Sequence, residues 1–388
     1  MDFTKDGLAR LDAAVRRHVD SGEVPGAAAL VARGEAVHVV TAGRMALDGP
    51  AIARDSIFRI ASMTKPFTAV AAMMLVEEGK LRLDEPVTRL LPELESRRVL
   101  RTLASPLDDT VPAARPITVE DVLTFRLGWG VLFDPDTPIQ KAVAGVPGFG
   151  MPDPASPYTL DSFMQRLGEL PLMAQPGERW LYTVGSNVLG VLVARAAGKP
   201  LDTVIAERIC GPLELADTAF WVPAEKRGRF VTAYVNEGGK LGVYDKPDGL
   251  YARPPSFPAG DSGLVSTIGD FARFAAFLQT GLAPGGERLI SASTLHAMQT
   301  NRLTPAQMMD GEMILGPGWG WGYGLGVLAG DGGYGIGRGA YGWNGGFGTS
   351  WFNDPSRDLV AVLLTQRFFD SPEPPAIHQD FWRAAVQA

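Results

Sequence analysis

The sequence predicts an α+β fold in which the two ends of the chain build a sheet and the middle forms a mostly helical region. Apolar segments typical of strands occur near the N-terminus and again after Trp319, whereas helix-patterned segments dominate between them. One amphipathic helix is expected at each end of the chain. The 388 residues suffice for a large domain with a second one inserted into it. The simplest arrangement is a sheet of N- and C-terminal segments flanked by the terminal helices.

The N-terminal elements follow from changes in the hydrophobic period. Leu8, Leu11 and Val15 recur at helical spacing, and Pro25-Gly26 ends that pattern. Two apolar segments joined by a short turn then predict a hairpin. The expected elements are a helix over residues 2–21, strands over 27–31 and 36–41, a short strand before Ser62 and a helix over 63–78.

The middle of the chain is predicted to be helical and interrupted by two long loops. Thr118 and Asp121 stand three residues apart before an apolar run, which indicates a capped helix start. The loops at 128–157 and 236–258 are rich in Gly, Pro and aromatic residues, a composition that favours a lid or a pocket wall. Further helices are expected at 160–167, 188–197, 267–279 and 377–386, and strands at 323–328, 339–343, 348–353 and 359–365.

Composition and charge exclude several classes of protein. The net charge is −7 and no basic run occurs, which argues against nucleic-acid binding. Cys210 is the one cysteine, so no intrachain disulfide and no cysteine metal site is expected. The first twenty residues lack the apolar core of a signal peptide, and no apolar run is long enough for a membrane span. We therefore expect a soluble, cytoplasmic protein.

The stretch Ser62-Met63-Thr64-Lys65 lies where the short strand passes into the first long internal helix. Ser62 would stand at the positive end of that helix, and Lys65, three residues on, would come up on the same face. A hydroxyl nucleophile needs a base beside it, and a desolvated lysine at this spacing can serve. The alternative is that Ser62 is an N-cap and Lys65 a solvated surface residue.

Other hydrolytic and metal-dependent arrangements find less support. A Ser-His-Asp triad needs a histidine as base, yet the four histidines fall in predicted helices or in an early strand. No Gly-x-Ser-x-Gly elbow, His-Glu-x-x-His cluster or Gly-Lys-Ser phosphate loop occurs. Gly260-Asp261-Ser262-Gly263 is similar to a trypsin-like nucleophile turn, but Leu264 replaces the next glycine. We interpret it as a turn before the 267–279 helix, and we expect no metal and no cofactor.

Two later segments could complete a serine-lysine site. Tyr182 precedes a predicted helix, and a tyrosine flanked by a lysine can act as a general base. The alternative is a buried aromatic residue with a satisfied hydroxyl. The segment Trp343-Asn344-Gly345-Gly346 carries glycines that let a strand edge approach a ligand and leave backbone N–H groups free for an oxyanion. The alternative here is a glycine-rich turn between strands.

With these three motifs in this order, the chain resembles the serine β-lactamase and penicillin-binding protein superfamily. It is most similar to the class C β-lactamase-like branch and, within that, to the family VIII carboxylesterases. The matches run through most of the chain and include segments outside the three motifs. These segments are residues 79–87, 121–124, 187–190, 212–213, 217–220 and 262–267.

The resemblance implies a fold and a role for each motif residue. The implied fold is β-lactamase/transpeptidase-like, with a mainly antiparallel sheet flanked by helices. Residues 1–80 and 255–388 would form this sheet domain, residues 81–254 a mostly helical domain, and the active site would lie between them. Ser62 would be the acylated nucleophile, with Lys65 and Tyr182 as the proton-transfer pair. The N–H groups of Ser62 and Gly346 would form the oxyanion hole.

Two departures from the β-lactamase and peptidase branch point toward an uncharged ester as the substrate. That branch carries Tyr-x-Asn, whereas Val184 stands at the third position here. It also carries Lys-Thr-Gly, whose lysine would hold a substrate carboxylate, whereas Trp343-Asn344-Gly345 stands here. Family VIII enzymes show Trp-Gly-Gly at this place, so Asn344 is itself unusual.

The sequence thus predicts a serine carboxylesterase that works through an acyl-enzyme, with weak β-lactamase activity as a side reaction. A β-lactamase or D-Ala-D-Ala carboxypeptidase, an acyltransferase and a non-catalytic scaffold stay open as alternatives. We expect no nucleic-acid partner, and neither the acyl-chain length nor the oligomeric state is predicted. The small-molecule ester is expected to contact Trp343, Asn344, Gly345, Trp129 and Phe133.

Overall fold

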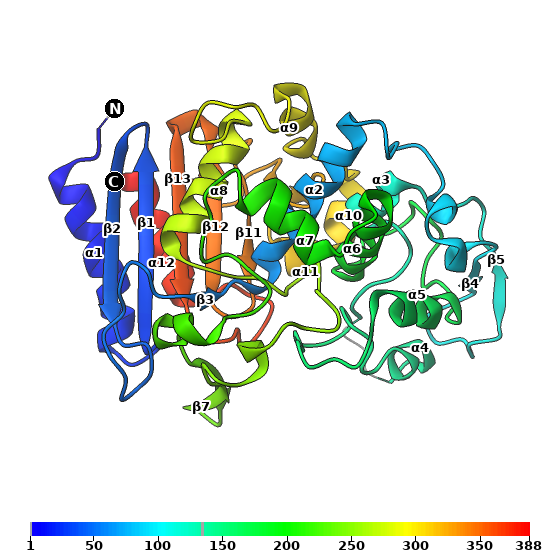
Figure 1. The fold of residues 1–388 in the computed structure, drawn as a ribbon, viewed down its shortest axis with the longest axis horizontal. Coiled ribbons are helices and arrows are strands. Elements are labelled where there is room, and N and C mark those ends of the chain that lie inside the picture. The colour runs from blue at the N-terminus through cyan, green and yellow to red at the C-terminus, as the bar shows by residue number, and fades with distance from the viewer. Residues whose placement is uncertain (1, 133–135) are drawn as a thin grey trace.

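A seven-stranded sheet forms the centre of the computed structural model, which describes residues 2–132 and 136–388 (Figure 1). Its strands are β1 (Gly26–Arg33), β2 (Ala36–Gly43), β9 (Trp319–Trp321), β10 (Gly326–Leu328), β11 (Tyr341–Gly345), β12 (Thr349–Asp354) and β13 (Leu359–Thr365). The strand order is β2-β1-β13-β12-β11-β10-β9, and every neighbouring pair is antiparallel. The N-terminal hairpin therefore lies beside the last strand of the chain, and the predicted sheet built from both ends is confirmed.

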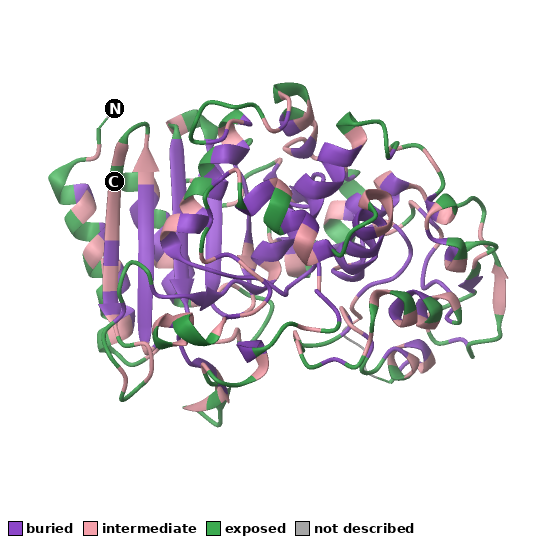
Figure 2. Cartoon of the chain, in the orientation of Figure 1, coloured by how far each residue is buried: buried purple, intermediate pink, exposed green. Residues whose placement is uncertain are grey.

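Helices cover both faces of this sheet. The terminal helices α1 (Lys5–Asp20) and α12 (Ala376–Gln387) pack on one face, and α8 (Ile268–Thr280) packs on the other. Successive side chains of a strand point to opposite faces, so Ala27 and Ala29 join the cluster under the terminal helices while Ala28 and Leu30 join the opposite one. This is why β1 and β13 are apolar at nearly every position, and Figure 2 shows the strands at the centre of the sheet buried along most of their length.

The remaining elements lie between β2 and β9 in the sequence and are mostly helical. The helices are α2 (Lys65–Glu77), α3 (Val119–Leu123), α4 (Pro138–Ala142), α5 (Leu160–Gly168), α6 (Val184–Ala197), α7 (Leu201–Ile205), α9 (Ala292–Met298), α10 (Pro305–Asp310) and α11 (Glu312–Leu315). The paired short strands are β3 (Phe58–Arg59) with β8 (Val265–Ser266), β4 (Arg98–Leu100) with β5 (Thr110–Pro112), and β6 (Ala233–Glu237) with β7 (Lys240–Asp245). No helix in the described ranges is long and apolar enough to cross a membrane.

Three stretches outside the predicted helices and strands contain regular structure. Residues 96–115 include the β4–β5 hairpin, and the 128–157 loop includes α4. The 236–258 loop includes β7, whose pairing with β6 contains an irregularity in register. These strands are short and carry polar residues, so their apolar alternation is too weak to identify from the sequence. The two-domain division with a boundary at residue 255 stays a prediction. Backbone hydrogen bonds of Tyr234 with residues 366 and 368 tie β6 to the segment after β13.

His378 on α12 is completely buried between the helix and the sheet. Its ring packs against the rings of Phe369 and Trp382 at centroid separations of 5.1 and 5.8 Å. Burial penalises the charged imidazolium and lowers the pKa of His378 to about 4. The native state therefore holds this ring neutral.

This burial predicts a loss of stability in mild acid. The unfolded chain binds a proton at this ring near its ordinary pKa of about 6.5, so it carries more protons than the native state between that value and about 4. The contribution is fully present above pH 6.5 and falls as the pH drops, by up to roughly 3 kcal/mol. Urea unfolding from pH 7 to pH 4 should show a smaller loss for His378→Leu than for wild type. His296→Gln, at an exposed histidine, should match wild type, and equal losses in all three proteins would contradict the assignment.

Candidate active site

Ser62 lies on a sharp turn between β3 and α2. The turn begins at Ala61, which is buried and has φ +42°, a left-handed conformation that non-glycine residues rarely adopt. A single 3-10 turn over Ala61–Thr64 then leads into α2, and Ser62 is its half-buried member. The Thr64 hydroxyl accepts a hydrogen bond from the backbone N–H of Leu264, which fixes the turn on the neighbouring segment. The predicted strand-to-helix passage is confirmed, and it presents the Ser62 hydroxyl.

Lys65 is fully buried below Ser62. Its Nζ donates to Ser62 Oγ at 2.8 Å and to the backbone carbonyl oxygen of Asp261 at 2.9 Å. It makes no ion pair with any residue that the structure describes. The alternative of a solvated surface lysine is therefore wrong. A buried ammonium group needs hydrogen-bond acceptors to offset its lost hydration, and the nucleophile is one of its two acceptors.

Tyr182 stands two residues before α6, with its ring beside Lys65. The ring centroid lies 4.5 Å from Lys65 Nζ, a distance at which the cation and the aromatic face attract each other. Its hydroxyl oxygen accepts a hydrogen bond of 2.7 Å from the indole Nε1 of Trp343 on β11. Within the described ranges no hydrogen bond joins this hydroxyl to Ser62 or Lys65. Trp343 therefore contacts the Tyr182 hydroxyl directly.

Buried aromatic rings form the wall behind Tyr182. Its ring lies 5.8 Å from Phe125, 5.6 Å from Trp180 and 6.4 Å from Trp321. Trp321 also packs edge-on against Trp343 at 4.6 Å and stacks on Phe125 at 4.7 Å. The sequence did not identify Phe125, Trp180 and Trp321 as neighbours, because no sequence motif relates these single aromatic residues to one another.

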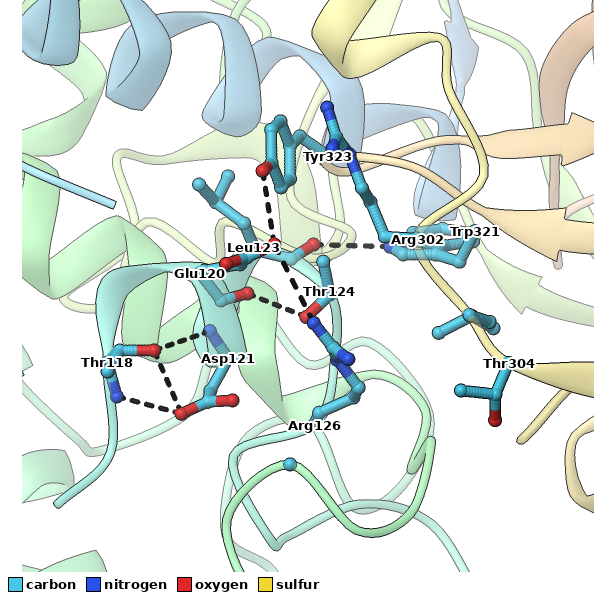
Figure 3. Close-up of polar contacts among 12 residues, drawn as sticks. Thr118, Glu120, Asp121, Leu123, Thr124, Arg126, Arg302, Thr304, Trp321 and Tyr323 are labelled. Carbon is cyan, nitrogen blue, oxygen red and sulfur yellow. Dashed lines mark hydrogen bonds and ion pairs between the residues drawn. The ribbon is translucent and has the colours of Figure 1, made fainter. Parts of the chain in front are cut away.

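Helix α3 and strand β9 hold this wall together (Figure 3). The capping box predicted at Thr118 is present, with Asp121 as its second member. The indole Nε1 of Trp321 donates to the carbonyl oxygen of Leu123 at 3.2 Å, and the Tyr323 hydroxyl donates to Glu120 at 3.2 Å. Burial and the nearby Glu120 carboxylate raise the pKa of Tyr323 to about 12, so this hydroxyl stays a donor. These contacts join the helical middle of the chain to the sheet beside the site.

The end of strand β11 lies directly against the Ser62 turn. A Cβ atom on Gly345 would lie 2.2 Å from the carbonyl oxygen of Ile60, so only glycine allows this approach. The Thr349 hydroxyl donates to the same carbonyl at 3.2 Å. Neither the Ser62 nor the Gly346 amide donates a hydrogen bond to another residue in the described part of the chain. Both amides are therefore free to bind a ligand oxygen, as an oxyanion hole requires.

An apolar cluster lies next to Ser62, the predicted nucleophile. It contains Ala61 and Phe347, with the half-buried rings of Tyr244 and Phe368 packed against it. Tyr244 and Phe347 are 5.3 Å apart, and the Tyr244 hydroxyl donates to the carbonyl oxygen of Pro152 at 2.9 Å. The two long loops predicted to wall the pocket thus meet at Tyr244, next to the turn that carries Ser62.

A buried ion pair fixes this loop arrangement. Arg59, three residues before Ser62, donates to the Asp245 carboxylate and, at 2.7 Å, to the Val231 carbonyl oxygen. Its guanidinium lies 3.9 Å from the Phe230 ring centroid and 5.1 Å from that of Tyr251. Burial lowers the pKa of Arg59, and Asp245 acts in the opposite direction. The pair connects the strand before the nucleophile to the residue after Tyr244.

The remaining predicted pocket residues are Trp129, Phe133 and Asn344. Trp129 is fully buried in the main core and donates from Nε1 to the Pro171 carbonyl oxygen at 2.8 Å, so we leave it out of the proposed pocket. Phe133 lies outside the described residues. Asn344 is half-buried on β11 between Trp343 and Gly345.

The fold is that of the β-lactamase/transpeptidase-like class of proteins. The chain belongs to the beta-lactamase family, whose sequence model matches residues 11–381. It is 38% identical over 370 residues to Protein Rv1367c of Mycobacterium tuberculosis, covering 91% of this chain and 88% of that protein. It is 30% identical to Esterase EstB of Burkholderia gladioli, covering 95% and 92%. The solved structure of EstCE1, a hydrolase with promiscuous acyltransferase activity, aligns with a TM-score of 0.84 at 25% identity, covering 98% and 99%.

The close approach of β11 to the Ser62 turn predicts a strict requirement for glycine at position 345. Gly345→Ala would place its methyl group 2.2 Å from both the Ile60 carbonyl oxygen and the Thr349 hydroxyl. Overpacking of this kind costs about 1–3 kcal/mol, so the urea midpoint should fall. Gly269 in α8 has no atom within 4 Å of its added Cβ, so Gly269→Ala should leave stability unchanged or raise it. Equal stability of Gly345→Ala and wild type would contradict the described packing.

Proposed function

We propose that this protein is a serine carboxylesterase that works through an acyl-enzyme on Ser62. The observation that carries the proposal is the fully buried Lys65 ammonium group, 2.8 Å from the hydroxyl of Ser62. A purely structural serine at a helix start has no need of a buried cation beneath it. The free amides of Ser62 and Gly346 supply the second requirement, a site for the oxyanion. The same arrangement argues against a non-catalytic scaffold.

The proposed reaction consists of two acyl transfers. Ser62 Oγ attacks the ester carbonyl carbon and gives its proton to the deprotonated hydroxyl of Tyr182, whose negative charge the Lys65 ammonium group balances before the transfer. The carbonyl oxygen becomes an oxyanion and binds the amides of Ser62 and Gly346. The C–O bond to the alcohol then breaks, and the alcohol leaves with the proton from Tyr182. In the second half, water attacks the carbonyl carbon of the acyl-enzyme and gives a proton to Tyr182. Tyr182 returns that proton to Ser62 Oγ as the carboxylic acid leaves.

The residues around the site favour an uncharged, apolar ester. Trp343, at the place of the carboxylate-binding lysine, donates its one side-chain N–H to the Tyr182 hydroxyl oxygen. Val184, at the place of the amide-binding asparagine, is fully buried and offers no polar atom. The half-buried ring of Tyr244 adds apolar surface beside the turn that carries Ser62. We therefore propose a neutral acyl or alcohol group of short to medium length.

The relatives support the ester as substrate and add a second candidate. Esterase EstB and the hydrolase EstCE1 both match nearly the full length of this chain. The name of EstCE1 also includes acyltransferase activity, and an alcohol could replace water in the second half of the proposed reaction. A transferase reaction on the same acyl-enzyme is therefore our second candidate, and it uses the same residues.

Ser62→Ala should abolish ester hydrolysis, because its hydroxyl is the proposed nucleophile. The measurement is hydrolysis of p-nitrophenyl butyrate, with the labelled residue located by mass spectrometry after treatment with a fluorophosphonate. Ser350→Ala is the control at a second serine, since Ser350 is buried and its hydroxyl oxygen accepts a hydrogen bond from Trp382 on α12. Its activity should stay at the wild-type level. Labelling of any serine other than Ser62 in the wild-type protein would refute the assignment.

Lys65 and Tyr182 should act as one unit, because the ring of one lies against the charge of the other. We expect Lys65→Ala and Tyr182→Phe each to lower kcat by about 10³-fold or more, and the double variant to be little worse than either. The measurement is a double-mutant cycle on kcat. Losses that multiply in the double variant would show that the two residues work independently.

β-Lactams should be poor substrates compared with esters. The nucleophile and the oxyanion site can accept a strained amide, but a charge-assisted bond to its carboxylate, about 1.5–3 kcal/mol or roughly ten- to a hundred-fold in binding, is missing. Trp343→Lys should shift the ratio of kcat/KM for nitrocefin over kcat/KM for p-nitrophenyl butyrate toward nitrocefin. Its ester activity should also fall, since the bond to Tyr182 is lost. A wild-type enzyme that prefers nitrocefin would support a β-lactamase instead.

A further inference from the structure

The turn over residues 259–264 is wedged between α2, which carries Lys65, and α6, which follows Tyr182. Gly260 makes this possible, because a Cβ there would lie 2.6 Å from the Ser186 carbonyl oxygen on α6 and 3.1 Å from Thr68 on α2. The Thr68 hydroxyl donates to the Gly260 carbonyl oxygen at 2.8 Å. The Gly-Asp-Ser-Gly tetrapeptide is thus a turn, as predicted, but one that lies between two helices of the site.

The peptide groups of Asp261 connect both helices to the nucleophile. The carbonyl oxygen of Asp261 accepts the 2.9 Å hydrogen bond from Lys65 Nζ, the second of that group's two acceptors. Its backbone N–H donates to the side-chain oxygen of Asn187 on α6 at 3.2 Å. A continuous chain of hydrogen bonds therefore runs from Asn187 through the main chain of Asp261 to Lys65 and Ser62.

The carboxylate of Asp261 is buried in the same place. The residue is 5% exposed, and its oxygens accept from the Ser262 hydroxyl at 2.7 Å and the Thr183 hydroxyl at 3.3 Å. It forms no ion pair with any described residue. A buried carboxylate held by hydroxyl groups alone is costly. The turn nevertheless keeps it directly beside Tyr182, since Thr183 is the next residue.

We propose that Asp261 is a positioning residue of the catalytic centre. Its carboxylate, held by Ser262 and Thr183, fixes the orientation of its own peptide group, and that peptide group holds Lys65 Nζ on Ser62 Oγ. The same carboxylate ties Thr183, next to Tyr182, to the turn whose carbonyl oxygen accepts the hydrogen bond from Lys65. The proposal rests on the proposed function, because it assigns to Asp261 the geometry on which the attack by Ser62 depends.

This role predicts a particular pattern of kinetic loss. Without the hydrogen bonds of the Asp261 carboxylate, Lys65 moves relative to Ser62. A displacement of about 1 Å at a reacting group lowers the rate about 10²-fold. The rings of Phe347 and Tyr244 belong to another cluster and are unaffected. The loss should therefore fall on kcat and leave KM unchanged.

The test compares Asp261→Ala and Asp261→Asn with wild type. The readouts are the rate of Ser62 labelling by a fluorophosphonate and kcat and KM for p-nitrophenyl butyrate, with thermal unfolding as the check of folding. Asp261→Ala should label Ser62 about 10²-fold more slowly. Asp261→Asn keeps the shape and can still bond both hydroxyls, so it should label within about three-fold of wild type. The control is Asp270→Ala, at a buried aspartate that accepts from the Asp217 N–H and the Thr218 hydroxyl, 2.8 and 3.2 Å away, outside the site.

The outcomes of this experiment test the proposed function and the positioning role of Asp261 separately. Wild-type protein that is not labelled at Ser62 would overturn the proposed function itself. If wild type is labelled, a folded Asp261→Ala that reacts at the wild-type rate, or that changes KM alone, overturns the positioning role. An Asp261→Asn as slow as Asp261→Ala also overturns it, because charge and not position would then matter. Should Asp261→Ala fail to fold, the double variant Ser262→Ala with Thr183→Val takes its place. We expect it to react at least about ten-fold more slowly, and the wild-type rate would count against the proposal.

Discussion

The burial of the Lys65 ammonium group between Ser62 Oγ and the Asp261 carbonyl oxygen constrains the whole site. A buried cation that forms no ion pair with a described residue is stabilised by neutral acceptors at hydrogen-bond distance. The structure supplies them from two segments nearly two hundred residues apart in sequence, at 2.8 and 2.9 Å. The left-handed Ala61, the glycine at 260 and the glycine at 345 each permit one of the close approaches that bring these segments together. The strain at Ala61 is offset by this network.

A second buried cation organises the mouth of the site. Arg59 lies on the strand before the nucleophile and is bonded to Asp245, the residue after Tyr244. Removing one partner of such a buried pair leaves an unpaired charge, which typically costs about 3–5 kcal/mol. The ion pair therefore holds the hairpin that carries Tyr244 against the strand that leads to Ser62. The shape of the apolar surface and the position of the nucleophile depend on each other.

The sequence predicted most of the fold and only part of the site. The long helices and six strands of the large sheet were identified because their hydrophobic periods are regular, as in the Leu8–Leu11–Val15 face. The three-residue strand β9 was not among the predicted strands. The three motifs located Ser62, Lys65, Tyr182 and the β11 segment, which the structure does bring together. The short β4–β5 hairpin was missed, because three-residue strands have no measurable period. Trp129 was assigned to the pocket from loop composition alone, yet it lies in the core.

The contacts between distant segments could not be predicted from one sequence. Trp343 was identified as a departure from a lysine, but its hydrogen bond to Tyr182 depends on how β11 faces the start of α6. Asp261 belonged to a motif that the sequence did show, and its bonds to Thr183 and Asn187 arise only when α6 packs beside that turn. In both cases the residue type was visible and the partner was not.

The central claim is that Ser62, the Gly346 amide and Lys65 form one acyl-transfer centre. A crystal structure of the protein after reaction with a p-nitrophenyl phosphonate tests it most directly, because the adduct imitates the tetrahedral intermediate. We expect phosphorus bonded to Ser62 Oγ and one phosphoryl oxygen within about 3 Å of the Ser62 and Gly346 amides. Lys65 Nζ should stay bonded to Ser62 Oγ and to Asp261. A phosphoryl oxygen that points away from Gly346, or an adduct on another residue, would contradict the account.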